Sequence, residues 1–201
     1  MQREYQNPEL RELRDQQIRF APRPKKLQQV EAAERLIAEI DGEKSYPYEY
    51  VCFRITGYRP TDSVPAKIKG DDLRHDLRLF VEDLSDSADM TADNIGEQVL
   101  TVEELAKQFN VSTKTISRWR ELGLVSRRLV FDGRKRVGFL RSSVDRFVKT
   151  NHERVARGAR FSQLTEEQRQ EIIDRARRLA SAGGGQSEIS RRLAKRAGRS
   201  I

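Results

Sequence analysis

The sequence predicts a mainly α-helical fold made of small units, and three observations support this prediction. Hydrophobic residues make up 36% of the 201 residues and charged residues 35%, a balance that suits several small helical units better than one large sheet. Apolar residues recur at three- and four-residue steps in several stretches, which is the period of an amphipathic helix. The clearest strand signal is a pair of alternating apolar runs on either side of Asp132–Gly133.

The net charge of +8 is unevenly distributed along the chain. Residues 1–100 hold 15 Lys and Arg against 20 Asp and Glu, a net charge of −5, whereas residues 101–201 hold 24 against 11, a net charge of +13. A basic unit attached to an acidic one is typical of nucleic-acid binding, although a basic surface alone also suits an acidic protein or a membrane surface.

The composition disfavours several classes of protein. No run approaches the roughly 18 apolar residues that span a bilayer, and the first ten residues lack an apolar signal core, so we expect a cytoplasmic protein without a membrane partner. With Cys52 as the single cysteine and only two histidines, we expect no disulfide, no metal site and no cofactor. Cys52 stands among apolar and aromatic neighbours, which favours a buried small hydrophobe over a nucleophile.

The acidic half begins with a polar segment, residues 1–26, expected to be a tail or a loosely attached helix that two prolines interrupt near its end. Residues 27–86 are expected to form a small acidic helical domain, because two stretches within it have helical periodicity. The aromatic stretch 46–60 fits either a buried helix or a strand. Residues 87–98 are polar and lack periodicity, so we expect a linker there.

The first basic unit, residues 99–150, opens with signals for a short helix. Thr101 and Glu104 have the spacing of a capping box, and the helix is expected to run to about Phe109. Asn110 then occupies a turn, where its tolerance of positive φ is useful.

A second short helix follows this turn. Ser112 can cap it, Ile116 and Trp119 share its inner face, and Gly123 can close it with a left-handed cap. Two short helices joined by a tight turn predict a helix-turn-helix whose second helix contacts DNA. The outward positions expected to contact base edges and phosphates are Thr113, Lys114, Ser117, Arg118 and Arg120.

The alternating runs around Asp132–Gly133 predict a β-hairpin, and a hairpin directly after such a helix is a wing. Its cations suit the phosphate backbone or the adjacent minor groove: Arg127, Arg128, Arg134, Lys135 and Arg136. Ser142 or Ser143 is expected to cap a further helix after the hairpin. The unit therefore reads as a winged helix-turn-helix.

The pattern "LTVEELAKQFNVSTKTISRWRELGLV", followed by "GRKRVGFLRSSVDRF", resembles the MerR/excisionase class of winged helix-turn-helix domains. Nearly the whole chain is also similar to the long N-terminal extension of a group of bacterial sigma-70-like RNA polymerase sigma factors. The stretches that carry this second likeness are "YPYEYVCFRITGYRP", "DLRHDLRLFVEDLSDSAD" and "FDGRKRVGFL". The resemblance implies a DNA-binding transcription protein with double-stranded DNA and the RNA polymerase core as partners.

The remaining basic residues are expected to form a linker, 151–163, and a helical segment, 164–201. Two predicted helices flank a glycine run in this segment, and the second has Arg191, Arg192 and Lys195 on its outward side. The pair reads as a helix-turn-helix that lacks its reading helix. A fragment, a truncated gene, or a helix pair that serves only as a phosphate clamp or protein-binding hairpin would each fit.

Two alternatives to the transcription hypothesis stay open from the residues alone. One is an excisionase-like accessory factor of DNA recombination, and the other is an adaptor whose acidic half contacts a protein. An enzyme is disfavoured because the acidic half offers only Asp and Glu on amphipathic helix faces and no phosphate-cradling glycine loop. We therefore expect no catalytic residues and no small-molecule substrate.

Overall fold

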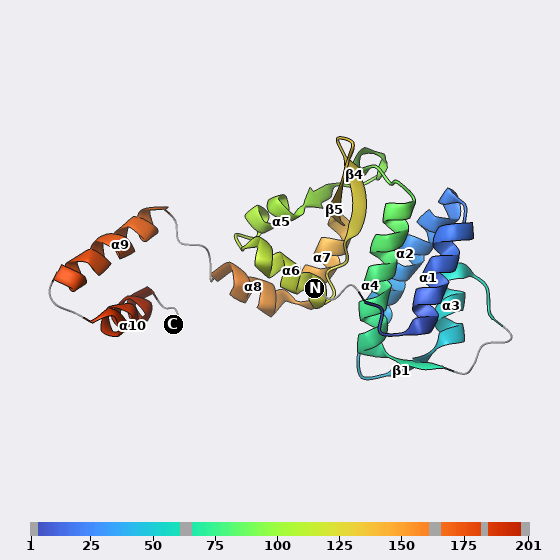
Figure 1. The fold of residues 1–201 in the computed structure, drawn as a ribbon, viewed down its shortest axis with the longest axis horizontal. Helices are drawn as coiled ribbons and strands as arrows, with labels where there is room; N and C mark the ends of the chain where they lie inside the picture. The colour runs from blue at the N-terminus through green and yellow to red at the C-terminus, as the bar shows by residue number, and fades with distance from the viewer. Residues whose placement is uncertain (1–3, 61–65, 161–165, 182–184, 198–201) are drawn as a thin grey trace.

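The part of the chain that the structure describes is mainly helical with two small antiparallel sheets (Figure 1). The computed structural model describes residues 4–60, 66–160, 166–181 and 185–197, with the backbone alone for 159–160, 166–169, 190 and 193–197. Within these residues no helix is both long and apolar enough to cross a membrane.

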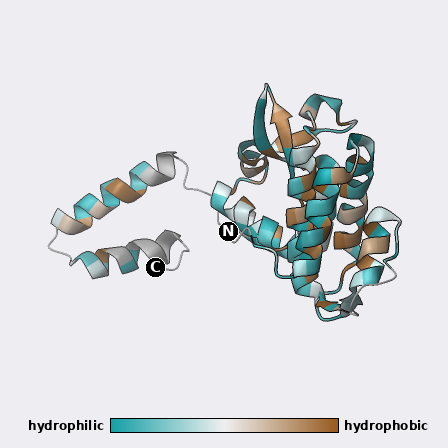
Figure 2. Cartoon of the chain, turned by 45° about the vertical axis from the view of Figure 1, so that its right-hand side comes forward, coloured by the Kyte–Doolittle hydropathy of each residue, from teal (hydrophilic) through white to brown (hydrophobic). Residues whose placement is uncertain are grey.

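Four helices form the N-terminal half: α1 (Pro8–Phe20), α2 (Arg23–Glu39), α3 (Tyr48–Thr56) and α4 (Gly70–Ser87). Helix α4 contacts both α1 and α2, and α2 contacts α3. A two-stranded sheet of β1 (Ser45–Pro47) and β2 (Lys67–Lys69) closes one end. Figure 2 shows hydrophobic and hydrophilic residues alternating along these helices, as amphipathic helices require.

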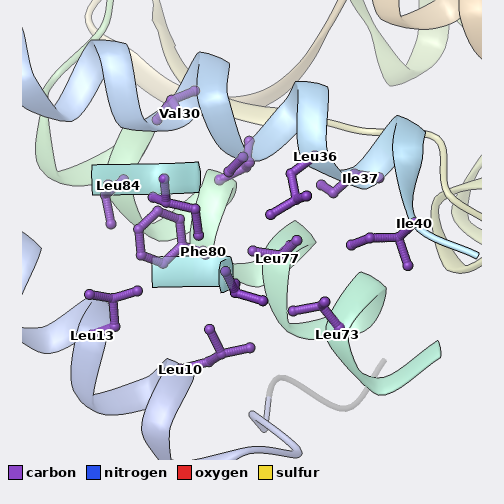
Figure 3. Packing of buried hydrophobic residues seen from close by; sticks show 14 of the residues in the cluster. Leu10, Leu13, Val30, Leu36, Ile37, Ile40, Leu73, Leu77, Phe80 and Leu84 are labelled. Carbon is purple, nitrogen blue, oxygen red and sulfur yellow. The ribbon is translucent and has the colours of Figure 1, made fainter. Parts of the chain in front are cut away.

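The core of this half lies on the apolar stripe of α4. Leu73, Leu77, Phe80 and Leu84 follow one another at three- and four-residue steps and are almost fully buried. Their side chains face those of α1 and α2 in Figure 3. Burying each such side chain contributes roughly 1.5–3 kcal/mol, so this stripe is a main source of stability for the half.

Residues 1–26, expected to be loosely attached, include a docked helix. Leu10 and Leu13 of α1 belong to the core and are 1% and 3% exposed. Before the helix, the backbone N–H groups of Gln6 and Asn7 donate to the carboxylate of Asp76 on α4 over 2.8 and 2.9 Å. The polar composition of the segment did not indicate this packing, because two leucines and the carboxylate of the distant Asp76 attach the segment to the core.

The aromatic stretch 46–60 contains both structures that its pattern allowed. Tyr46 lies in β1, and the chain turns at Pro47 into α3. Gly57 ends α3 in the left-handed conformation at φ 76°. Cys52 is buried within α3, as expected from its neighbours, and burial raises the pKa of its thiol.

A three-stranded antiparallel sheet organises the basic half. Its strands are β3 (Val99–Thr101), β4 (Arg127–Phe131) and β5 (Arg134–Leu140), in the order β3-β5-β4. The expected hairpin is confirmed: β4 and β5 are joined by Asp132 and Gly133 at φ 46° and 75°. Positive φ at both positions is the requirement of a type I′ turn, whose twist matches that of the strands.

Four helices accompany this sheet: α5 (Val102–Gln108), α6 (Thr113–Glu121), α7 (Arg141–Thr150) and α8 (His152–Arg160). Phe139 of β5 packs with α5, α6 and α7, while Leu129 of β4 packs in a separate cluster with Ala88 and Met90. The sheet therefore contributes side chains to two hydrophobic clusters, and one of them joins it to the end of α4.

The segment expected to be a linker, residues 87–98, packs along β4. Val130 N–H donates to the carbonyl of Met90 over 2.8 Å, and Thr91 forms a parallel bridge with Val130. A 3₁₀ turn (Ala92–Asn94) follows. Since this contact covers the outer edge of β4, the two halves are joined by backbone hydrogen bonds as well as side chains.

The region expected to be a basic linker, 151–163, is helical as far as the structure describes it. Val155 of α8 is buried in the cluster around α6 and α7. Two further helices, α9 (Glu166–Ser181) and α10 (Gln186–Ala197), contact each other. Thr165, which has the spacing of a capping box with Gln168, lies outside the described residues.

Candidate nucleic-acid interface

The start of α5 and the turn that follows this helix both take the conformations that the sequence predicted. Thr101 Oγ1 accepts from the Glu104 backbone N–H over 3.2 Å, and the Glu104 carboxylate accepts from the Thr101 N–H over 2.8 Å. This reciprocal pair confirms the capping box. Asn110 takes the expected left-handed conformation at φ 50°.

Helix α6 is fixed in orientation by its inner face. Ser112 Oγ accepts from the Thr115 N–H over 3.1 Å, and Ile116 and Trp119 are 0% and 3% exposed. The Trp119 ring lies 5.7 Å from that of Phe147 on α7, measured between centroids. Because the buried residues set the rotation of α6, the residues on its other side are held outward.

The outward face of α6 contains four of the five residues predicted for it. Thr113, Lys114, Ser117 and Arg118 are all exposed. Lys114 and Arg118 are one helical turn apart, a rise of about 6 Å. Neither cation pairs with a carboxylate in the described part of the chain, so both ammonium and guanidinium groups are available to an anionic ligand.

The fifth predicted residue, Arg120, points the other way, and its assignment to DNA is corrected. Its Nη2 donates to the Glu82 carboxylate of α4, and its Nε donates to Ser126 Oγ over 3.1 Å. Ser126 Oγ itself donates to Glu82 over 2.7 Å. Arg120 therefore links α6 to the acidic half.

Arg127 is also removed from the predicted DNA-contacting set. It is 5% exposed, and its guanidinium donates to both carboxylate oxygens of Glu34 on α2 over 2.7 and 2.8 Å. Arg128 is half-buried, and its backbone N–H donates to Ser85 Oγ over 2.9 Å. The Arg127 guanidinium is thus held inside the protein, whereas the Arg128 side chain lies on the other face of β4 and stays a predicted phosphate contact.

The three cations at the tip of the hairpin differ in whether they pair with a carboxylate. Arg134 and Arg136 are exposed and have no carboxylate partner among the described residues. Lys135 Nζ lies 2.8 Å from Asp89 Oδ1 and 3.1 Å from Asp86 Oδ1. Hydrogen bonds to Asp89 and then Asp86 raise the pKa of Lys135 above its usual value, so this cation is already partly neutralised.

The first turn of α7 is capped differently from the prediction. Neither Ser142 nor Ser143 provides a side-chain cap; the cap position is Leu140. Instead, the Glu97 carboxylate accepts from Ser142 N–H over 2.7 Å and from Ser142 Oγ over 2.9 Å. A carboxylate supplied from 45 residues away satisfies the helix end, and the local pattern did not indicate it.

The predicted residues of the C-terminal pair are only partly described. Arg191 is exposed, and Arg192 Nη2 lies 2.6 Å from Glu188 Oε1 on the same helix. The side chain of Lys195 lies outside the described residues. These positions do not join the surface of α6 through any contact that the structure gives.

Two cations of the region expected to be a basic linker lie on α8. Arg154 and Arg157 are exposed, while Val155 and Gly158 on the same helix face inward. A Cβ at Gly158 would lie 3.4 Å from the Trp119 ring, which places α8 against the inner side of α6. The three-residue spacing of Val155 and Gly158 is the sequence signal that indicates this helix.

The described residues contain no group of three or more His, Cys, Asp or Glu that could hold a metal ion. The outward face of α6 presents hydrogen-bond donors and positive charge. No family model, curated protein or solved structure matches this chain.

Proposed function

We propose that this protein binds double-stranded DNA as a winged helix-turn-helix, with α6 in the major groove and the β4–β5 hairpin as the wing. The observation that carries the proposal is the pair Lys114 and Arg118, exposed and without a carboxylate partner among the described residues. They project from a helix whose opposite face is locked by Ile116 and Trp119. A rigid helix of this kind is what base recognition requires.

The chemistry of the outward face supports sequence reading. Arg118 and Lys114 are donors suited to guanine O6 and N7, and Thr113 and Ser117 add hydroxyl groups. At the wing, Arg134 and Arg136 suit phosphates, which position a protein on the duplex without reading sequence. The proposal therefore separates two roles, specificity from α6 and affinity from the wing tip.

The acidic half has a supporting role in this proposal. Glu34 and Glu82 hold Arg127 and Arg120, and Asp86 and Asp89 hold Lys135. The hairpin and α6 are thereby held against α2 and α4. We propose that this fixes the angle between wing and reading helix.

Selection from a random double-stranded DNA library, at two salt concentrations, tests the proposal. We expect the full chain to enrich a defined motif of roughly half to one helical turn, and Lys114→Ala and Arg118→Ala to change that motif. Arg134→Ala is expected to weaken binding to all sequences alike and to lower the salt dependence by about one counterion. An unchanged motif in both α6 variants would contradict reading by α6.

The wider proposal, that the protein acts in transcription and contacts the RNA polymerase core, rests on the sequence resemblance alone. It is tested by passing purified core polymerase over the immobilised full chain after nuclease treatment. We expect retention of polymerase by the wild type and equally by Arg118→Ala, because DNA bridging is removed. Flow-through of polymerase would contradict the sigma-factor assignment and leave duplex binding unaffected.

A further inference from the structure

A groove of about 680 Å³ lies in the N-terminal half, between α1, the start of α2, and α3 with the residues that follow it. This volume is within the range of ligand sites in proteins. The side chains that line it and matter here are Gln16, Gln17, Phe20, Lys25, Tyr48 and Tyr58. None of them belongs to the surface of α6 or the wing.

Exposed aromatic rings gather around this groove. Phe20 is 75% exposed and Tyr58 64% exposed, and both line it; Phe53, which follows the lining residue Cys52 in α3, is 43% exposed. Leu122 and Ile173, the exposed large aliphatic residues of the described chain, lie elsewhere. Leu13, Ala21, Pro22 and Pro60 also line the groove, so the two exposed rings lie beside other apolar side chains. Exposed apolar surface of this kind often marks a binding site.

Cations accompany the rings. The guanidinium of Arg19 lies 5.8 Å from the Phe20 centroid, and that of Arg59 lies 5.3 Å from the Phe53 centroid. Lys25 lines the groove. In the described part of the chain none of these three has a carboxylate partner, although the groove is in the acidic half. Positive charge is thus kept locally, where the rings are.

The groove also offers amides. Gln29 Nε2 donates to Gln17 Oε1 over 2.7 Å, which fixes the Gln17 side chain and leaves its own amide N–H group for a ligand. Gln16 donates to Glu12 over 3.4 Å, so the one carboxylate among the lining residues already accepts a hydrogen bond. Fixed amides can read the edges of a planar heterocycle.

We propose that this groove binds the unpaired bases of a single-stranded nucleic acid, with Phe20 and Tyr58 as stacking surfaces and Lys25, Arg19 and Arg59 contacting the phosphates. Rings combined with cations are the usual components of such sites. A groove for an amphipathic peptide would instead take a row of apolar anchors along a helix, whereas the exposed large hydrophobic residues that line this one are the rings of Phe20 and Tyr58. The site is separate from the proposed duplex-reading surface and does not depend on it.

The test is binding of fluorescently labelled single strands of about twelve nucleotides, one of deoxythymidine and one of uridine, to the full chain by anisotropy. We expect both strands to bind, and Phe20→Ala and Tyr58→Ala each to weaken binding by about tenfold or more. Tyr58→Phe, which keeps the ring, is expected to retain binding. Because both rings are largely exposed, these substitutions leave the core intact.

Two controls separate this site from α6. Ile173→Ala removes an exposed side chain outside the groove and should change nothing. The double variant Lys114→Ala, Arg118→Ala should lose duplex binding and retain single-strand binding. Photocrosslinking of a 5-bromodeoxyuridine strand should label the peptide containing Phe20 or Tyr58. Absence of single-strand binding by the wild type would overturn the proposal. So would single-strand binding that is lost in the Lys114→Ala, Arg118→Ala variant and retained in Phe20→Ala and Tyr58→Ala. Binding of an acidic peptide by a chain that binds neither strand would also overturn it.

Discussion

The guanidinium of Arg127 and the carboxylate of Glu34 form a two-bond ion pair across 93 residues, with Nε to Oε1 at 2.7 Å and Nη2 to Oε2 at 2.8 Å. The side chains are 6% and 8% exposed. A buried pair in this geometry satisfies the hydrogen bonds of both charged groups, and removing either group leaves the other charge buried without a partner. The pair therefore joins the hairpin to α2.

We expect Arg127→Met to destabilise the protein by about 3–5 kcal/mol, because it leaves the Glu34 charge buried and unpaired. Glu34→Leu should lower the free energy of unfolding by a similar amount, because it leaves the Arg127 charge buried and unpaired. Urea unfolding of the full chain measures both. The double variant should cost less than either single one, since no charge remains; a double variant as unstable as the sum of the two would contradict the pairing.

Gly138 on β5 tests the packing of side chains within the three-stranded sheet. A Cβ there would approach Phe131 and Val99 to 2.9 Å and Leu129 to 3.0 Å. Gly138→Ala is therefore expected to cost about 1–3 kcal/mol through overpacking, measured by urea unfolding. Gly96→Ala is the matched control, since a Cβ at Gly96 meets nothing within 4 Å. Equal stability of the two variants would contradict this packing.

The capping box predicts a pH dependence. Hydrogen bonds from the Thr101 N–H and then its hydroxyl lower the pKa of Glu104. A carboxyl with a lowered folded-state pKa contributes stability above its unfolded pKa, about 4.3, and that contribution is lost as pH falls through the folded pKa. Glu104→Gln, which keeps an N3 acceptor, should flatten this part of the acid unfolding profile.

Thr101→Ala supplies the comparison for the capping box, with an expected loss of about 1 kcal/mol at neutral pH. Stability of both variants is measured by urea unfolding at several pH values. A profile for Glu104→Gln that falls as steeply as the wild type between about pH 5 and pH 3 would show that another carboxyl dominates there.

Asp86 and Asp89 pair with Lys135 at the tip of the β4–β5 hairpin, and we expect the loss of both carboxylates to strengthen duplex binding. Asp86→Asn with Asp89→Asn should raise duplex affinity by about two- to fivefold, the range of an exposed ion pair. Asp93→Asn is the control, because Asp93 is exposed and pairs with no cation among the described residues. An equal gain per charge in the control would mean that net charge alone is responsible.

Local signals in the sequence predicted the parts of the fold that local forces determine. Thr101 with Glu104, Asn110, and Asp132–Gly133 each act within four residues, and each takes the expected conformation. The inner positions Ile116 and Trp119 were also predicted, because helical spacing alone assigns them to one face.

The missed features involve partners far along the chain. Arg120 and Arg127 have the residue type of a DNA contact, and only the positions of Glu82 and Glu34, 38 and 93 residues away, turn them inward. Glu97 capping α7 is missed for the same reason. A cation on a strand looks alike in sequence whether a carboxylate or a phosphate faces it.

The most direct test of the account compares Arg118→Gln with Arg120→Gln, two substitutions of the same chemistry two residues apart on α6. For each, duplex affinity is measured by anisotropy on the selected motif and stability by urea unfolding. We predict that Arg118→Gln lowers the affinity for duplex DNA by about tenfold, as expected for a base contact, and keeps wild-type stability. We predict that Arg120→Gln lowers the stability of the fold and keeps wild-type duplex affinity. Wild-type affinity in Arg118→Gln together with weakened DNA binding in a folded Arg120→Gln would contradict the assignment of α6 as the reading surface.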